Sequence, residues 1–401
     1  MKKLLCILLC LMLSFSLFAC NGDDSSSSSS DSGSTTESTD TGTSSSSGDE
    51  TPADDKRSAE YVSFWSTDTI TNETVMLQED ETGWIAGGLL FEPTEILEIK
   101  NYDLTISYNS SDYVMNGRYM ERTENSEMPY MSYDIVSCSD LSGTNLGTLG
   151  GLVFTETKEI ASYLLNVTYK YDRTREDWAF RPENKSDVLT NFQRKLKEKK
   201  DIKLFLYGDS IGAGCHASSV LDYNPYMPIW GKAVANEISK KYETKVDFYN
   251  ASQGGWTSAD GARNISQKIS IVPYETPDIA IIEFGMNDGS AMVSAKTYAG
   301  NIKTIIAGIR ESAPDCDIVL ISTIKANPLC GQDKELTGSY HNENLKICEE
   351  YERCVTVNMT ALCDELYSKK DGLDLLANNI NHPNDFLVRC FVMNILDVIE
   401  G

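Results

Sequence analysis

Ser210 and His382 are the side chains of this sequence whose types could together carry out nucleophilic catalysis. Ser210 ends the stretch Gly208-Asp209-Ser210, directly after an apolar run, and His382 comes near the end of the chain. A serine hydroxyl is a poor nucleophile until a base removes its proton, and the unperturbed pKa of histidine lies close to neutrality. Taken alone, however, Ser210 could equally well cap a helix that follows a strand, so the interpretation depends on the surrounding sequence.

Two further polar stretches also follow strand-like apolar runs. Residues 250–258 come after the run at 246–249, and residues 283–288 come after the run at 279–282. Ligands bind at the carboxyl ends of the strands in open α/β sheets, so these polar groups can converge with Ser210 on one edge of a sheet. His382 stands just before the last amphipathic segment and can reach the same edge. This convergence favours a catalytic site over a simple helix cap.

The four stretches resemble the sequence blocks of the SGNH, or GDSL-type, hydrolases: G-D-S, a glycine after a second strand, G-x-N-D, and a histidine close to the C-terminus. The resemblance covers about residues 202–401. It implies that Ser210 is the nucleophile, that His382 is the base, and that Ser210, Gly255 and Asn287 donate to the oxyanion. It also implies a flavodoxin-like three-layer α/β/α domain with a parallel sheet, working without a cofactor. With only three histidines in the chain, we expect no structural zinc site.

The sequence departs from this family at one position. The usual pattern is D-x-x-H, but the residue three before His382 is Asn379. An aspartate there would orient the imidazole and stabilise the imidazolium. The first interpretation is a Ser210–His382 dyad, with Asn379 or a backbone carbonyl orienting the ring. The alternative is a carboxylate from elsewhere, such as Asp374 or Asp385.

Three other residues could lie near the nucleophile. Trp256 follows Gly255 directly, and Tyr226 lies in the loop after the first strand, so their rings could line a sugar-binding surface. His216 is six residues beyond Ser210. We expect it to be a polar loop histidine, with a place at the mouth of the site as the alternative.

The N-terminus predicts export. Residues 1–19 combine a basic start, a short apolar core and a small residue at the end, which is typical of a secretory signal. Residues 17–20 (LFAC) resemble the lipobox of bacterial lipoproteins, which implies lipidation of Cys20 and a place in the bacterial cell envelope, facing outside the cytoplasm. An ordinary signal peptide that happens to contain a cysteine is the alternative.

Composition limits the partners. Residues 20–58 are dominated by Ser, Thr, Gly, Asp and Glu, and we predict that they form a disordered tether. The formal net charge of the whole chain is −25, which argues against nucleic acid as a partner, because phosphate binding needs basic patches. A neutral, well-hydrated polymer such as a polysaccharide is compatible with this charge.

The rest of the chain is predicted to fold in two parts joined by a connector at 176–200. Residues 59–175 show short β-prone runs at 96–99, 104–108 and 162–169, which favour a small β-sandwich. Residues 201–401 alternate strands and helices, which implies a parallel sheet covered on both faces. We expect strands at 203–207, 246–250, 278–284, 317–322 and 355–358, and helices near 230–242, 294–312, 345–353 and 385–399.

The two-part layout resembles bacterial carbohydrate esterases, which implies removal of acetyl or another small acyl group from a polysaccharide. The site residues by themselves indicate only ester hydrolysis, because one fold hosts many substrates. A lipase or thioesterase is a second hypothesis. A third, from another class, is a catalytically weak lipoprotein that binds carbohydrate.

Overall fold

The computed structural model describes residues 57–174, 178–273, 276–331 and 334–400. The predicted signal peptide, Cys20 and nearly all of the predicted tether lie outside these residues. Within the described part of the chain, no helix has the length and apolar character that a bilayer span requires.

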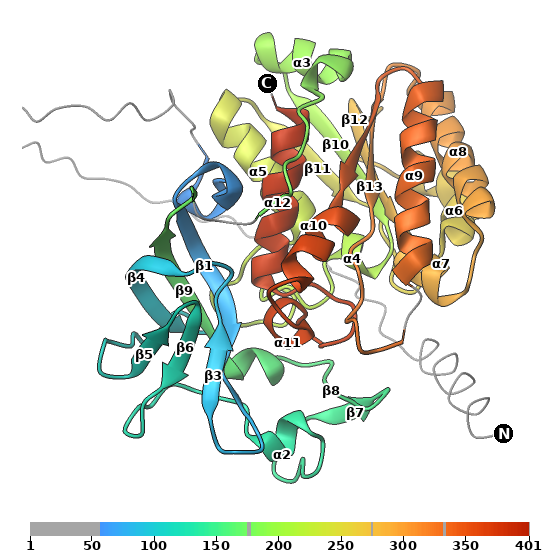
Figure 1. Cartoon of the computed structure of the whole chain (residues 1–401). Helices are drawn as coiled ribbons and strands as arrows, with labels where there is room; N and C mark the ends of the chain where they lie inside the picture. Colours follow the sequence, from blue (N-terminus) through green and yellow to red (C-terminus); the bar gives the residue numbers. More distant parts are fainter. Residues whose placement is uncertain (1–56, 175–177, 274–275, 332–333, 401) are drawn as a thin grey trace, which may run out of the picture. The chain divides into compact units, whose positions relative to one another are not determined.

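An open sheet of five parallel strands forms the centre of the C-terminal part (Figure 1). Its spatial order is β11-β10-β12-β13-β14, so the first strand along the chain lies between the second and the third. This order makes the carboxyl ends of β10 and β12 the topological switch point, where ligands bind in doubly wound folds. The strands are β10 (Ile202–Gly208), β11 (Val246–Asn250), β12 (Ile279–Phe284), β13 (Asp317–Ser322) and β14 (Cys354–Asn358).

Helices cover both faces of this sheet. Successive residues of β10 point to opposite sides, because side chains alternate along a strand. Leu204 and Leu206 join one hydrophobic core, and Phe205 and Tyr207 join the other. The first core includes α5 (Trp230–Tyr242), α10 (Met359–Tyr367) and α12 (Asp385–Ile399), and the second includes α6 (Ser258–Ser270), α8 (Ala295–Ser312) and α9 (Lys334–Glu350).

The predicted three-layer α/β/α fold with a parallel sheet is therefore confirmed, as is a smaller strand-rich part before it. The last helix, α12, is buried along almost its whole length, as expected for a segment packed between a sheet and a neighbouring part. The remaining short elements of this region are η4 (Ser186–Val188), α3 (Thr190–Lys197), α4 (Ser210–Ala213), α7 (Met286–Ser290) and α11 (Gly372–Leu375).

The strand-rich part consists of three small antiparallel sheets. The first has the order β1-β9-β4, the second β2-β3-β6-β5, and the third is the hairpin β7-β8. The strands are β1 (Thr69–Met76), β2 (Gln78–Glu79), β3 (Ile85–Gly88), β4 (Pro93–Asn101), β5 (Tyr113–Asn116), β6 (Tyr119–Arg122), β7 (Gly147–Leu149), β8 (Leu152–Phe154) and β9 (Leu164–Tyr171). The helical turns are η1 (Ala59–Tyr61), η2 (Phe64–Ser66), α2 (Tyr133–Val136) and η3 (Ile160–Tyr163).

One expected strand is wrong. Residues 104–108 do not form a strand and contribute a single bridge between Ser107 and Lys100 of β4. Leu104 has a φ of 61°, in the left-handed region, and its N–H donates to Asn101 O. The chain therefore turns where the pattern of β-prone residues predicts an extended run.

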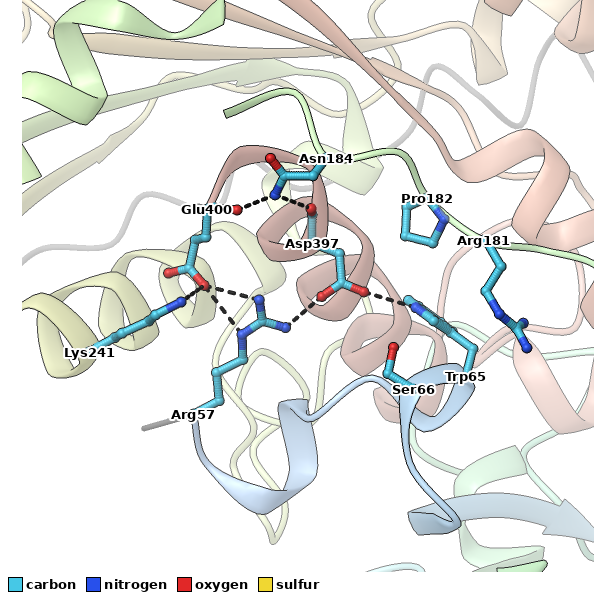
Figure 2. A pocket seen from close by; sticks show the side chains of 9 residues that line it. All are labelled: Arg57, Trp65, Ser66, Arg181, Pro182, Asn184, Lys241, Asp397 and Glu400. Carbon is cyan, nitrogen blue, oxygen red and sulfur yellow. Dashed lines mark hydrogen bonds and ion pairs between the residues drawn. The ribbon is translucent and has the colours of Figure 1, made fainter. Parts of the chain in front are cut away.

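The strand-rich part and the α/β part share one hydrophobic core. The Phe64 ring stacks on Phe386 of α12 at a centroid distance of 6.2 Å, and both residues are fully buried. At the start of the described chain, Arg57 pairs with Asp397 and Glu400 near the end of α12 (Figure 2). These contacts make residues 57–400 one compact unit in which the N-terminal sheets are packed directly on the C-terminal helix.

Figure 2 shows a polar hollow beside the end of α12. It encloses about 330 Å³ and is lined by Arg57, Trp65, Lys241 and the end of α12. Several of its charged groups pair with one another: Arg57 and Lys241 both pair with Glu400, and Trp65 Nε1 donates to Asp397. The hollow is thus a structural ion-pair network.

Candidate active site

Ser210 is held at the switch point by the sharp turn from β10 into α4. Asp209 is the N-cap of that helix, and its Oδ1 accepts a hydrogen bond from Ile211 N at 2.9 Å. As the first helical residue, Ser210 has no acceptor for its own N–H inside the helix. The hydroxyl and the backbone N–H of Ser210 therefore both lie at the carboxyl edge of the sheet.

His382 reaches Ser210 from the loop before α12. The distance from His382 Nε2 to Ser210 Oγ is 2.9 Å, which is hydrogen-bond range. Burial lowers the pKa of His382 well below its usual range, and the neighbouring His216 lowers it further. The imidazole is thus neutral near pH 7, so Nε2 can accept the serine proton. The structure brings together the two residues that the sequence singled out as nucleophile and base.

His216 lies directly beside His382, which is close to the alternative that the sequence left open for it, a place at the mouth of the site. Its Nδ1 lies 2.8 Å from Nδ1 of His382, and the ring centroids are 4.7 Å apart. His216 is buried, with only 5% of its surface exposed, so it is not the polar loop histidine that we expected. The only signal in the sequence was its position shortly after the nucleophile.

Glu156 approaches the far side of the His216 ring. Its Oε2 lies 3.2 Å from His216 Nε2, at ion-pair distance but without hydrogen-bond alignment. Glu156 belongs to the loop after β8 in the strand-rich part, and about half of its side chain is exposed. Nothing in the sequence pattern connects it with Ser210.

Gly255 lies in the turn after β11, and Asn287 lies in the short helix α7 that follows β12, so both are placed as expected for oxyanion donors. Gly255 has a φ of 78°, which favours glycine, and a Cβ on the adjacent Gly254 would lie 4.0 Å from Ser210 Cβ. Asn287 Nδ2 donates to Trp256 O at 2.9 Å and lies 3.5 Å from Asp209 Oδ2. An amide nitrogen carries two hydrogens: one holds the Trp256 carbonyl, and the other makes the long 3.5 Å bond to Asp209 Oδ2, which an oxyanion would replace.

Two buried carboxyl groups lie beneath the nucleophile. Asp209 and Glu283 are both fully buried and interact with each other, and Glu283 Oε2 also accepts from Gly212 N at 3.1 Å. Burial raises the pKa of Asp209 to about 7. Burial, and then the charge of Asp209, raise the pKa of Glu283 well above its usual range. Because two adjacent buried carboxylates repel each other, Glu283 is the protonated member of the pair near pH 7.

Asn379 does not orient the catalytic ring, contrary to the first interpretation of the sequence. Its Nδ2 donates to Val153 O of β8 at 2.9 Å, and its Oδ1 accepts from Asn327 Nδ2 at 2.8 Å. Its φ of 59° turns the backbone so that the side chain lies against the strand-rich part. The amide nearest to His382 is that of Asn378, whose Nδ2 lies 3.2 Å from His382 Nδ1.

The two aspartates considered as substitutes have other partners. Asp374 Oδ1 accepts from Met76 N of β1 at 2.8 Å, and the side chain also lies 3.6 Å from Lys370 Nζ. Asp385 Oδ1 accepts from Ser218 N at 3.1 Å. Both carboxylates thus fasten loops around the site, and neither is placed as the third member of a triad.

The aromatic residues proposed to line the site differ in exposure. Trp256 is half-buried, with its ring 6.3 Å from that of Tyr207 and with Lys268 Nζ 5.0 Å from its centre. Tyr226 is 52% exposed and has a φ of 54°. Tyr226 therefore presents a ring to solvent, whereas much of Trp256 packs on the protein. The described residues contain no group of three or more His, Cys, Asp or Glu side chains that could hold a metal ion.

Comparison with known proteins agrees with this geometry. Residues 206–386 match the GDSL-like Lipase/Acylhydrolase family. Ser210, Gly255, Asn287 and His382 all fall within the matched stretch of this acylhydrolase domain. His216 falls within it too, whereas Glu156 lies outside it.

Several relatives are esterases. An arylesterase of Vibrio mimicus is 26% identical over 130 residues, which are 32% of this chain and 58% of that protein. A two-domain esterase active on acetylated mannans aligns with a TM-score of 0.42 and 17% identity, over 53% of this chain and 52% of that one. A mutant of an acetyl-xylooligosaccharide esterase from a Geobacillus species aligns with a TM-score of 0.40 and 18% identity, over 50% of this chain and 94% of that one. The chain thus spans between half and two thirds of the first two relatives.

Proposed function

We propose that this protein is a serine ester hydrolase that removes acetyl or another small acyl group from a polysaccharide. The single observation that carries the proposal is the 2.9 Å separation of Ser210 Oγ and His382 Nε2 inside the acylhydrolase domain. A neutral imidazole within hydrogen-bond distance of a serine at a strand–helix turn is the arrangement that nucleophilic acyl transfer needs.

The reaction would run in two halves. In the first, Ser210 Oγ attacks the acyl carbon while its proton passes to His382 Nε2. The negative oxygen of the tetrahedral intermediate accepts hydrogen bonds from the N–H groups of Ser210 and Gly255 and from the Asn287 amide. The intermediate collapses, the sugar oxygen leaves with the proton from His382, and Ser210 keeps the acyl group. In the second half, His382 takes a proton from water as the water attacks the acyl-serine. The bond from Ser210 Oγ to the acyl carbon then breaks, His382 returns the proton to Ser210 Oγ, and the carboxylic acid leaves.

The polysaccharide substrate is supported by charge and by the character of the relatives. The net charge of −25 disfavours anionic partners such as nucleic acid, whereas acetylated mannans and acetyl-xylooligosaccharides, named for two of the relatives, are neutral polymers or oligomers. The half-exposed Tyr226 ring offers a flat apolar surface of the kind that sugar rings contact.

We further propose that the enzyme works at the surface of the cell envelope, anchored by lipid on Cys20. The motivation is the stretch at residues 17–20, followed at once by a polar tract. A stable anchor needs more than one acyl chain or a second membrane signal.

Ester substrates of different acyl length test the proposed specificity. Purified protein lacking residues 1–20 should hydrolyse p-nitrophenyl acetate faster than the butyrate and octanoate esters, and it should release acetate from at least one acetylated polysaccharide in a panel. Faster hydrolysis of the octanoate ester would favour a lipase. Turnover of none of the three esters would leave a carbohydrate-binding protein as the better hypothesis.

A further inference from the structure

The base His382 needs an acceptor at Nδ1, and the residue that the family pattern would supply is absent. We propose that His216 and Glu156 together replace the missing aspartate. In this arrangement His216 orients the His382 ring, and Glu156, contributed by the strand-rich part, balances the positive charge that forms during catalysis. This inference rests on the proposed function and adds two positioning residues to it.

The tautomer of His382 that catalysis requires determines which neighbouring residue can accept a hydrogen bond from its ring. For Nε2 of His382 to accept the serine proton, the hydrogen of the neutral ring must be on Nδ1. That N–H needs an acceptor, and His216 Nδ1 lies 2.8 Å away. A neutral His216 accepts there when its own hydrogen is on Nε2, the atom that lies 3.2 Å from Glu156 Oε2. One tautomer of each ring therefore lets hydrogen bonds run from Ser210 through His382 to His216, and the N–H at His216 Nε2 then faces Glu156 Oε2 at ion-pair distance without hydrogen-bond alignment.

Asn378, the other group near His382 Nδ1, cannot act as this acceptor. Its Oδ1 already accepts from the backbone N–H groups of Ile380, Asn381 and His382, at 3.0 to 3.1 Å. These three contacts fix the orientation of the amide. If the side-chain amide were flipped, its NH₂ group would face three backbone N–H donors and no hydrogen bond could form. Nδ2 is thus the atom that faces the ring, and an amide nitrogen only donates. His216 remains as the acceptor.

The backbone conformation and the burial of His216 set it apart from an ordinary surface loop residue. His216 has a φ of 70°, in the left-handed region that non-glycine residues rarely adopt. Its Nε2 is buried and has no aligned hydrogen-bond partner among the described residues. Strained backbone and an incompletely satisfied buried polar atom are more common at functional sites than in ordinary loops.

The strand-rich part positions Glu156 through contacts with the same loop that carries His382. Asn379 donates to Val153 O of β8, three residues before Glu156, and Asp374 and Asn384 both bond to β1. Hydrogen bonds therefore run from both sides of the His382 loop into the N-terminal sheets. On this view the strand-rich part completes the active site, in addition to any binding of carbohydrate.

Substitutions at His216 separate positioning from packing. In asparagine and aspartate, Oδ1 occupies nearly the place of histidine Nδ1, and both residues tolerate a positive φ. His216→Asn therefore keeps an acceptor for His382, His216→Asp adds a negative charge, and His216→Ala removes the acceptor. His341→Gln, in helix α9 away from Ser210, is the matched control for loss of a histidine.

We expect His216→Ala to lower kcat on the order of a hundredfold, which is less than the ten-thousandfold loss of a triad aspartate, with KM within about twofold. His216→Asn should stay within about tenfold of wild type, and His216→Asp should move the acidic limb of kcat/KM to higher pH, because a carboxylate favours the imidazolium of His382. Circular dichroism and thermal melting of each variant check that the fold is intact.

Glu156→Gln should lower kcat, as His216→Ala does, but by less, because half of the Glu156 side chain is exposed and its charge is screened by solvent. We expect a loss of kcat of about fivefold at most and a shift of the acidic limb to lower pH. Glu159→Gln, in the same loop, is the matched control and should change neither quantity.

Two outcomes would overturn the inference: wild-type activity in folded His216→Ala, or an equal loss in His216→Ala and His216→Asn. Ser210→Ala, measured alongside, keeps this failure distinct from failure of the proposed function. If Ser210→Ala abolishes hydrolysis while His216→Ala does not affect it, only the role of His216 and Glu156 is wrong. If Ser210→Ala remains active, the proposed function itself is wrong.

Discussion

Replacement of Asn287 by alanine removes a donor that does two things at once. Its Nδ2 holds the turn after β11 through the 2.9 Å bond to Trp256 O, and its second hydrogen, which makes a long 3.5 Å bond to Asp209 Oδ2, is the one that would donate to the oxyanion. Loss of one oxyanion-hole donor costs about 3 to 4 kcal/mol of transition-state stabilisation, which is a fall in kcat of about a hundredfold to a thousandfold. Loss of the bond to the Trp256 carbonyl costs about 1 kcal/mol of folding stability.

The assay is steady-state hydrolysis of p-nitrophenyl acetate, with urea unfolding to measure stability. We expect kcat of Asn287→Ala to fall by about a hundredfold or more while KM stays nearly constant, because the donor acts mainly in the transition state. Asn287→Asp should be no better than Asn287→Ala, since a carboxylate would face both the Trp256 carbonyl and Asp209. A change confined to KM would refute the reasoning and make Asn287 a substrate-binding residue.

Three further predictions concern pH and location. The acidic inflection of kcat/KM, which reports the protonation of His382, should lie below pH 6.5, because burial and the neighbouring His216 lower the pKa of His382. An inflection above pH 6.5 would contradict this. Glu283 binds its proton more tightly in the folded protein than in the unfolded chain, so the free energy of unfolding falls as pH rises above 4.5 until the raised pKa is passed. Glu283 contributes at most about 1.4 kcal/mol per pH unit to this fall. Urea titrations of Glu283→Gln should show the fall reduced by that contribution, and an unchanged pH dependence would refute the prediction. Cys20→Ser should move the protein from the membrane fraction of its native host to the soluble fraction, and a soluble unaltered protein would contradict lipidation.

The sequence predicted the strands of the sheet and helices α5, α8 and α12 well because their signals are local, whereas the helix expected at 345–353 covers only the end of α9 (Lys334–Glu350). The expected bounds of β11, β13, α5 and α12 coincide with those of the structure. Each is an apolar run of the right length, or a segment with helical spacing, between clear turns. Helix α6 was missed because its first turns, from Ser258 to Asn264, are polar and only Ile265 and Ile269 mark the buried face.

Only those residues of the candidate site that belong to a sequence motif could be predicted from the sequence. Ser210 and His382 belong to such motifs, and they lie within hydrogen-bond distance. Asn379 was chosen by spacing alone, and its positive φ directs the amide elsewhere. Glu156 is distant from Ser210 in the sequence and meets His216 only because the strand-rich part packs on the α/β part, a tertiary contact that no local pattern records.

The most direct test of the central claim is the hydrolysis of p-nitrophenyl acetate by Ser210→Ala beside the wild-type protein. In the proposed reaction, Ser210 Oγ is the atom that becomes acylated, so its removal prevents formation of the acyl-enzyme. The serine side chain is small, so alanine leaves the turn between β10 and α4 in place. We predict an unchanged thermal melt and hydrolysis reduced by about a millionfold, to the level of the assay background. Wild-type hydrolysis by a folded Ser210→Ala protein would contradict the claim that Ser210 is the nucleophile.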